Sequence, residues 1–243
     1  MKIIALIPAR LESERFPNKL IKKLHGVPII VRTYLSALNS KLFDQVYVVT
    51  GNDEIIDLIK SNDGLTFKSR KIHQSGTDRI AEAAKEIDHD IVVNLQGDEP
   101  LIDINDIKNL NYQAITKNSD LATLACKIDD QKKNNNPNIV KVMTEDDLSF
   151  NTISRAIKFE RKSEYDNENH TYHHIGIYIF KTSILKKFVE FPQSLNEKNY
   201  KLEQLRALDN GINIDVILAK SSPVGIDTEE DYLEIKKLME YKS

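Results

Sequence analysis

The sequence predicts an α/β fold built on a doubly wound, mostly parallel sheet, with a smaller antiparallel excursion. Two observations support this class. Short strands that are apolar at nearly every position alternate with helical patterns in the first half of the chain, as a parallel sheet covered on both faces requires. After about residue 130 this alternation gives way to β-like runs separated by polar stretches. We therefore expect a single domain, 1–243, in which 130–195 forms an inserted antiparallel subregion.

The first half of the chain contains the clearest elements. KIIALI at 2–7 is typical of a buried strand. Pro28 suits the first position of a helix. Apolar residues follow it at every fourth position, at Ile30, Tyr34 and Leu38, which predicts one apolar face. The next predicted elements are a strand at 45–50, a short helix at 54–60, a helix at 78–87 and a strand at 90–96.

The second half begins with a polar segment at 129–138. β-like runs follow at 139–143 and 174–180, on either side of a charged stretch, and define the expected antiparallel subregion. The predicted elements that close the chain are a helix at 200–209, a strand at 213–219 and a charged helix from about 228.

Composition and charge exclude several classes of protein. The 34 basic and 37 acidic residues give a net charge of -3, which provides no general attraction for nucleic acid or an anionic membrane. Any anionic ligand must therefore be held locally. Cys126 is the only cysteine, so an intramolecular disulfide or a zinc site with several cysteines is impossible, and a buried structural thiol is expected. The apolar stretch at the N-terminus is too short for a signal peptide or a membrane span, and we expect a cytoplasmic protein.

Three loops that follow predicted strands carry the residues of interest, because ligands of open α/β sheets bind outside the carboxyl ends of the strands. The first loop, 8–19, contains Arg10, Arg15 and Lys19 ahead of a helix. Several cations beside the free amides of a helix N-terminus suit a polyphosphate. A solvated basic loop explains the same charges equally well.

The second loop is HQSGTDR at 73–79. Thr77 is expected to be a helix N-cap, with Asp78 and Glu82 favoured by the helix dipole. Gly76 also permits a flat base to approach the backbone closely, which is the weaker interpretation.

The third loop is NLQGDEP at 94–100, where a buried strand ends in acidic residues. The Asp98 carboxylate at the edge of the sheet is a hard oxygen ligand suited to magnesium beside nucleotide phosphates. Asp227 in VGIDTEEDY is a second carboxylate that can share this metal, although both side chains also fit solvated turns. Asp227 fits equally well as a helix cap, together with Thr228.

The histidines and the missing motifs narrow the choice further. His173 and His174 are adjacent, so on a strand they point to opposite faces and a zinc site is disfavoured. His174 and Tyr178 share a face and can line a pocket together with Gly176. Neither G-x-G-x-x-G nor G-x-x-x-x-G-K-[ST] is present, which disfavours dinucleotide-dependent dehydrogenases and P-loop enzymes.

Seven sequence blocks occur in an order that is more specific than any one of them: IPAR…S…RFP.K, HQSGTDR, NLQGDEP, NPNIVKV, HHIGIYIF, LEQLRAL and GIDT. Over nearly the whole chain this order resembles the 3-deoxy-manno-octulosonate (Kdo) cytidylyltransferase family. The resemblance implies an α/β nucleotidyltransferase fold and magnesium-dependent transfer of CMP from CTP to the anomeric hydroxyl of Kdo. It also implies that the product, CMP-Kdo, serves lipopolysaccharide biosynthesis, and that the enzyme is a homodimer built largely from the antiparallel region.

The same resemblance implies roles for individual residues. The magnesium ligands are Asp98 and Asp227, which form the catalytic set together with Arg10 and Lys19. The nucleotide-binding set is Ala9, Arg10, Ser13, Arg15, Lys19, Gln74, Ser75, Gly76 and Arg79. The sugar-binding set is Gln96, Arg161, His174, Tyr178, Glu203 and Gln204.

Two departures from the family pattern bear on specificity. Asn18 stands where glycine is common, and the run KFERKSEYD at 158–166 differs from the more aromatic version expected there. The second departure leaves open an 8-amino analogue of Kdo as substrate. A non-catalytic nucleotide-binding module is a further alternative. Sialic-acid cytidylyltransferases share IPAR but carry a glycine-rich next segment, which LESERFPNK is not.

Overall fold

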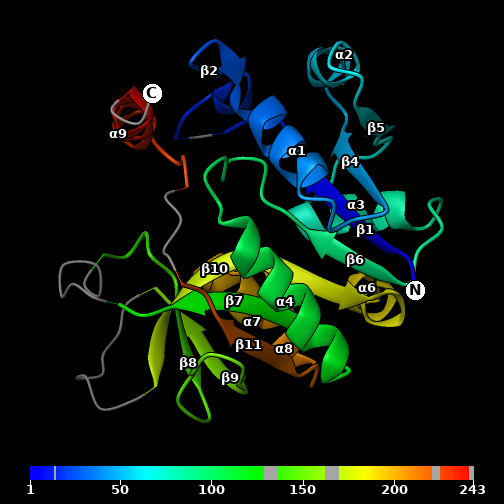
Figure 1. The fold of residues 1–243 in the computed structure, drawn as a ribbon. Helices are drawn as coiled ribbons and strands as arrows, with labels where there is room; N and C mark the ends of the chain where they lie inside the picture. Colours follow the sequence, from blue (N-terminus) through cyan, green and yellow to red (C-terminus); the bar gives the residue numbers. More distant parts are fainter. Residues whose placement is uncertain (14, 129–135, 162–169, 221–224, 241–243) are drawn as a thin grey trace. The chain divides into compact units, whose positions relative to one another are not determined.

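The computed structural model describes residues 1–13, 15–128, 136–161, 170–220 and 225–240. Contacts within the chain divide it into two compact units (Figure 1). The first unit is Met1–Ile104 with Pro223–Ser243, and the second is Asn105–Ser222. The sequence led us to expect one domain with a subregion at 130–195, whereas the division falls at 104 and 222.

The first unit contains a parallel sheet in the order β5-β4-β1-β6. Its strands are β1 (Ile3–Pro8), β4 (Gln45–Thr50), β5 (Leu65–Lys68) and β6 (Ile91–Asn94). Its helices are η1 (Lys19–Ile21), α1 (Ile29–Asn39), α2 (Asp53–Lys60), α3 (Gly76–Ala84) and α9 (Glu229–Glu240). A short hairpin joins β2 (Lys23–Leu24) to β3 (Val27–Pro28). The strands and helices predicted for this part of the chain are confirmed, and β5 is an additional strand.

The burial of the first unit explains why its strands are so apolar. The four central residues of β1 are completely buried, because α1 and α2 pack on neighbouring strands and α3 packs on β1, β4 and β6. β5 escaped prediction because it is a four-residue edge strand with no buried position. Short edge strands lack the continuous apolar pattern of central ones.

Helix α1 differs in two details from the prediction. It begins at Ile29, and Pro28 is the residue before the first helical position. Ile30 and Tyr34 are buried as expected, but Leu38 is 44% exposed and Ala37 faces the core. Spacing by four drifts around a helix of 3.6 residues per turn, so a position eight residues on lies about 80° off the starting face.

The second unit contains strands β7 (Leu121–Cys126), β8 (Lys141–Thr144), β9 (Ile153–Glu160), β10 (Thr171–Lys181) and β11 (Ile214–Leu218). β7 runs parallel to β11 and antiparallel to β10. β9 pairs antiparallel with β11 and β8, and β8 also pairs antiparallel with β10. The antiparallel strands predicted within 130–195 are therefore present, but they share their sheet with strands on either side of that segment.

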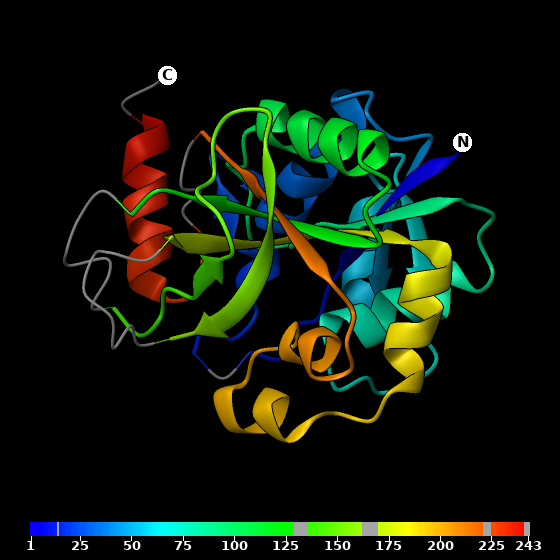
Figure 2. The ribbon, with the colours of Figure 1, turned by 90° about the horizontal axis from the view of Figure 1, so that it is seen from below.

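Helices cover both faces of the sheet in the second unit. They are α4 (Ile104–Thr116), α6 (Thr182–Glu190), α7 (Leu195–Tyr200) and α8 (Leu205–Asp209). Figure 2 shows α4 on one face of β7 and β11, with α7 and α8 on the other. Every residue of β7 is consequently buried, including Cys126, as predicted. The single helix predicted at 200–209 is wrong, because Lys201 adopts φ 52° and separates α7 from α8.

Candidate active site

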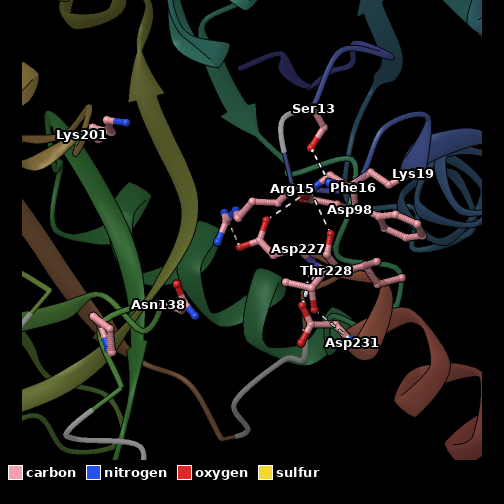
Figure 3. A network of polar contacts seen from close by, with 12 residues as sticks. Ser13, Arg15, Phe16, Lys19, Asp98, Asn138, Lys201, Asp227, Thr228 and Asp231 are labelled. Carbon is pink, nitrogen blue, oxygen red and sulfur yellow. Dashed lines mark hydrogen bonds and ion pairs between the residues drawn. The ribbon is translucent and has the colours of Figure 1, made fainter.

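The Lys19 ammonium is the meeting point of two acidic side chains in the first unit (Figure 3). Its Nζ donates to Asp98 Oδ2 and, at 3.2 Å, to Asp227 Oδ1. It also donates to the Ile226 carbonyl at 2.8 Å. The structure therefore brings together two carboxylates separated by more than half of the chain.

Backbone contacts at the end of β6 place Asp98. The Ile226 amide donates to the Asp98 carbonyl at 3.0 Å, which joins the segment before α9 to the loop after β6. A side chain at Gly97 does not fit easily, because an added Cβ would lie 3.0 Å from Ile30 Cδ1 and 3.4 Å from the Pro8 carbonyl. Glycine thus allows the loop after β6 to lie directly against β1 and α1.

Helix capping does not use the Asp227 carboxylate. Thr228 Oγ1 accepts from the Asp231 amide at 3.2 Å, and Asp231 Oδ2 accepts from the amides of Asp227 and Thr228 at 3.0 and 2.8 Å. These contacts satisfy the N-terminus of α9. The Asp227 carboxylate is instead turned towards Lys19 and towards Arg15, whose Nη2 lies 3.0 Å from Asp227 Oδ2.

At this site two carboxylates, Asp98 and Asp227, face two cations, Lys19 and Arg15. Burial by itself lowers the pKa of Lys19, but the neighbouring carboxylates Asp98 and Asp227 outweigh it and raise the pKa, so the ammonium is charged. Burial, reinforced by Asp98 and Asp227, raises the pKa of Glu99 to about 8. Glu99 is therefore mostly protonated at neutral pH, and it contributes little to the charge of the site. The two ionised carboxylates, Asp98 and Asp227, are therefore the groups of this site that can bind a further cation.

Two converging aspartates fit a magnesium ion. Mg²⁺ binds carboxylate oxygens and usually keeps several of its other ligands as water or phosphate oxygens. In the part of the chain that the structure describes, no group of three or more His, Cys, Asp and Glu side chains is arranged to hold a metal. Asp98 and Asp227 can thus supply two ligands, with water and substrate completing the shell.

Cations gather beside the loop that follows β1. The Arg79 guanidinium donates through Nη1 to the Ala9 carbonyl. Burial lowers the pKa of Arg79, and electrostatic repulsion from Arg10 lowers it further. Ser13 Oγ accepts from the Phe16 amide at 3.4 Å. An anion placed between these cations would relieve their repulsion.

Asn18 adopts φ 57° and ψ 21°, a left-handed conformation, immediately before η1. Glycine adopts this conformation without strain, and asparagine is among the residues that tolerate it best. The departure from the family pattern at Asn18 therefore leaves the turn before Lys19 in a glycine-like conformation.

In the second loop Ser75, not Thr77, caps the helix. Ser75 Oγ accepts from the Asp78 amide at 3.1 Å and donates to Asp78 Oδ2 at 2.7 Å. Thr77 is buried, and its hydroxyl accepts from Asn94 Nδ2 at 3.3 Å. A Cβ added to Gly76 would lie 3.3 Å from Pro8 Cγ, so this glycine lets α3 begin against β1. Gln74, in the same loop, is exposed.

His174 and Tyr178 lie together in the second unit, with ring centroids 5.5 Å apart. Their shared side of β10 is as predicted, although an irregularity in register separates Ile175 from Tyr178. His174 Nε2 lies 3.0 Å from Thr123 Oγ1. Burial, reinforced by His173, lowers the pKa of His174 to about 3, so the ring is uncharged at neutral pH.

The remaining sugar-binding candidates divide between the two units. Gln96 belongs to the first unit, whereas Arg161, Glu203 and Gln204 belong to the second. The Arg161 guanidinium donates to the carbonyls of Tyr200, Lys201 and Pro137 at 3.2, 3.3 and 3.4 Å. Gln204 is buried, and its Nε2 has no hydrogen-bond partner among the described residues.

Sequence reasoning missed two residues, Lys141 and Glu82, that hold segments near the candidate site residues by hydrogen bonds. Lys141 is buried and donates through Nζ to the carbonyls of Asn136 and Arg161 at 2.7 and 3.0 Å. Glu82 accepts hydrogen bonds from Ser69 and Arg70, just before the second loop, and contacts His73, the first residue of that loop. Its position in the first half of a helix suggested only a dipole effect. A local pattern does not show which distant groups a carboxylate accepts from.

The first unit has a parallel sheet, cations in the loop after its first strand, and paired carboxylates beyond the ends of its strands. This arrangement is that of an α/β nucleotidyltransferase. The model of the cytidylyltransferase family matches residues 4–214. The chain belongs to the 3-deoxy-manno-octulosonate cytidylyltransferase family. It is 42% identical to the relative of that name from Christiangramia forsetii, over 98% of this chain and 97% of the relative. It is also 42% identical to the one from Francisella tularensis subsp. tularensis, over 96% of each.

Solved structures show the same fold. A CMP:2-keto-3-deoxy-manno-octonic acid synthetase complexed with CTP matches with a TM-score of 0.91 and 29% identity over the whole of both chains. The UTP-bound UGPase from Acinetobacter baumannii matches with a TM-score of 0.73 at 11% identity, covering 100% of this chain and 95% of that one. The second likeness concerns the fold alone.

Proposed function

We propose that this protein transfers CMP from CTP to the anomeric hydroxyl of Kdo, releasing pyrophosphate and forming CMP-Kdo for lipopolysaccharide biosynthesis. The observation that carries the proposal is the convergence of Asp98 and Asp227 on Lys19, with Arg15 paired to Asp227. Membership of a family whose relatives are named for this activity supports the identity of both substrates.

The proposed reaction is an in-line substitution at the α-phosphorus of CTP. The anomeric oxygen of the sugar forms a bond to phosphorus, the bond to the bridging oxygen of pyrophosphate breaks, and the hydroxyl loses its proton. Such transfers depend mainly on positioning and on neutralising charge. Arg10 and Lys19 are proposed to offset the charge of the departing pyrophosphate, with Arg15, Ser13 and Ala9 around the triphosphate. Arg79 is proposed to lie near the cytidine end of the nucleotide.

We propose Mg²⁺ as the cofactor, held by Asp98 and Asp227. When bound, the ion neutralises phosphate charge and polarises the phosphorus towards attack. The ammonium of Lys19 holds the two carboxylates within reach of one cation, which supports this assignment. Gln74, Ser75 and Gly76 are proposed to meet the cytidine end of the nucleotide.

The residues proposed to bind the sugar are Gln96 of the first unit and Arg161, His174, Tyr178, Glu203 and Gln204 of the second. The buried Gln204 Nε2 supports this, since a buried donor without a partner costs free energy that a sugar oxygen can recover. Because His174 is uncharged, it is expected to bond hydroxyls, and Arg161 is the cation proposed for the sugar carboxylate. Three N–H groups of Arg161 already bond carbonyls, and a guanidinium has five in all.

The 8-amino analogue of Kdo is the second candidate substrate, because the run at 158–166 departs from the family pattern. Most of that run lies outside the described residues. The non-catalytic alternative is less well supported, since Asp98, Asp227 and Lys19 are all present and meet in space.

The assembly and location of the protein are proposed as follows. Contact of two copies through the antiparallel region is supported by the exposed apolar side chains Phe150 and Ile157, 50% and 54% accessible. None of the described helices has the length and apolar character needed to cross a membrane. We propose a cytoplasmic homodimer that takes CTP and Kdo as its small-molecule substrates. The doubly wound arrangement likewise stays a proposal for the whole chain.

A pyrophosphate-release assay tests the function directly. Kdo and its 8-amino analogue are compared side by side, with reactions lacking sugar, CTP or magnesium as controls. Release is expected only when all three are present, and faster with Kdo. Faster release with the amino sugar would assign the second substrate, and no release with either sugar would support the non-catalytic module.

A further inference from the structure

Glu82 on α3 ties the segment that follows β5 to the body of the first unit. Its Oε2 accepts from Ser69 Oγ at 2.7 Å and lies 2.7 Å from His73 Nε2. Its Oε1 accepts from the backbone amide of Arg70 at 3.1 Å. One carboxylate thus contacts three positions along a span of five residues.

This segment has few other means of holding its shape. Ser69 is anchored by its amide to the Thr50 carbonyl at 2.8 Å, and Ser75 caps α3 at the other end. Between these anchors Ile72 is fully exposed, so apolar packing does not fix the tip. The His73 and Glu82 side chains are 11% and 14% exposed, which shelters their contact from water.

The Glu82 carboxylate is ionised throughout the neutral range. Burial by itself raises its pKa, but the hydrogen bonds from Ser69, His73 and Arg70 outweigh this effect and lower the pKa to about 2. Hydrogen bonds to an ionised acceptor are stronger than those between neutral groups. The contact is thus suited to hold the segment during turnover.

We propose that Glu82 is a positioning residue for the nucleotide: by holding Ser69, Arg70 and His73, it presents the adjoining Gln74 and Ser75 to CTP in one fixed conformation. This inference rests on the proposed function, because it takes the nucleotide to be CTP. Glu82 itself does not touch the reacting atoms. Without it, the segment 69–75 would adopt several conformations, and only some of them would bind the nucleotide.

Three variants test the inference in the full-length protein. Glu82→Ala removes every contact, and Glu82→Gln keeps one acceptor oxygen in a side chain of the same shape. Glu86→Ala is the matched control. Glu86 follows α3 in the chain, and its Oε1 lies 3.5 Å from Nη1 of the exposed Arg70 side chain. Exposed ion pairs of that kind contribute little.

Initial rates of pyrophosphate release are measured against CTP at saturating sugar and magnesium, and then against the sugar. If the binding-competent conformation falls to one tenth of the population, Glu82→Ala raises the KM for CTP about tenfold. The kcat and the KM for the sugar are expected to stay within about twofold of the wild type, because the interactions of the reacting atoms are unchanged. Glu82→Gln is expected to be intermediate, and Glu86→Ala to match the wild type.

Calorimetric titration of CTP into each protein separates this inference from the proposed function. CTP affinity about tenfold weaker in Glu82→Ala than in the wild type supports positioning even if no sugar is turned over. A KM and an affinity for CTP within about twofold of wild type, with only a smaller folded fraction, would show a purely structural role and overturn the inference. Absence of pyrophosphate release from the wild type would overturn the proposed function instead.

Discussion

At the scale of single residues, environment decides which charges are available for chemistry. Lys19 is only 13% exposed, yet two carboxylates hold it in the charged form. Glu99 stands beside Asp98 and mostly keeps its proton at neutral pH, because burial disfavours a further negative charge there. Two neighbouring acidic residues thus differ in charge, which the dipeptide Asp98-Glu99 alone does not reveal.

Asp98→Asn tests the most important residue of the proposed site. The change keeps the shape but removes a negative charge, so we expect kcat to fall by at least about 100-fold. The free energy of unfolding is expected to change by less than about 1 kcal/mol, because the amide oxygen of the new side chain can still accept from Lys19. Steady-state kinetics and urea unfolding check both values, with Asp57→Asn on the exposed side of α2 as control. Near-normal turnover at saturating magnesium would refute the metal assignment.

The pKa of His174 predicts how stability depends on pH. The folded protein keeps this ring uncharged until the pH falls to about 3, whereas the unfolded chain takes up a proton from about pH 6.5 downwards. The unfolded state therefore binds more protons between these values, and the stability contributed by this residue is lost as the pH falls from 6.5 to 3. Burial is the larger cause of the lowered pKa of His174, and electrostatic repulsion from His173 adds to it.

Urea unfolding of the wild type and of His174→Gln between about pH 4 and pH 7 measures this contribution. The variant is expected to lose less stability on acidification than the wild type. His25→Gln serves as the control, because His25 is exposed in the turn between β2 and β3. Parallel curves for His174→Gln and the wild type would contradict the prediction.

At the scale of elements, turns and caps aim the functional side chains. Ser75 begins α3 two residues earlier than predicted, and Thr228 with Asp231 begins α9. Patterns of hydrophobicity located most helices and strands, since the burial that creates them repeats along the element. These patterns did not settle which residue caps either helix, because several neighbouring polar side chains can each accept a hydrogen bond from the same backbone amide.

Thr228→Ala tests the cap of α9. Loss of the hydroxyl removes the acceptor for the Asp231 amide and is expected to lower the free energy of unfolding by about 1 kcal/mol. It also loosens the turn that directs Asp227, so kcat is expected to fall severalfold. Thr228→Ser keeps the hydroxyl and should restore both values in thermal unfolding and kinetic measurements. Equal losses in the two variants would show that the methyl group, not the cap, is responsible.

At the scale of the whole molecule, the chain folds into two compact units, the first with parallel strands and the second with strands of both directions. The boundary at 104 was not expected, because the predicted change of pattern came later, at about residue 130. β7 is buried on every residue and looks like a strand of the parallel half, yet it pairs with β10 and β11 of the second unit. The pairing of β7 with its neighbours, rather than its apolar composition, therefore decides to which unit it belongs.

Ile157→Glu tests the proposed dimer. Ile157 is an exposed apolar residue on β9, and a charge buried in an interface without a partner is costly. We expect the wild type to sediment as a dimer and the variant to shift to a monomer at the same concentration. Leu38→Glu is the control on α1, where Leu38 is also exposed. A monomeric wild type, or an unchanged dimer in Ile157→Glu, would contradict the proposed contact.

The sequence by itself determined the alternating elements of the first unit, the single buried thiol, the position of the acidic and basic loops and the resemblance to one enzyme family. These follow from periodicity and from motifs that are local in the chain. Only the tertiary structure decided that Asp98 and Asp227 meet on Lys19, that Thr228 frees Asp227 from capping, and that Glu82 holds the loop before α3. Such contacts either join residues that are far apart in the chain or depend on which of several equivalent neighbouring residues forms the hydrogen bond. The packing of strands and helices decides between these possibilities.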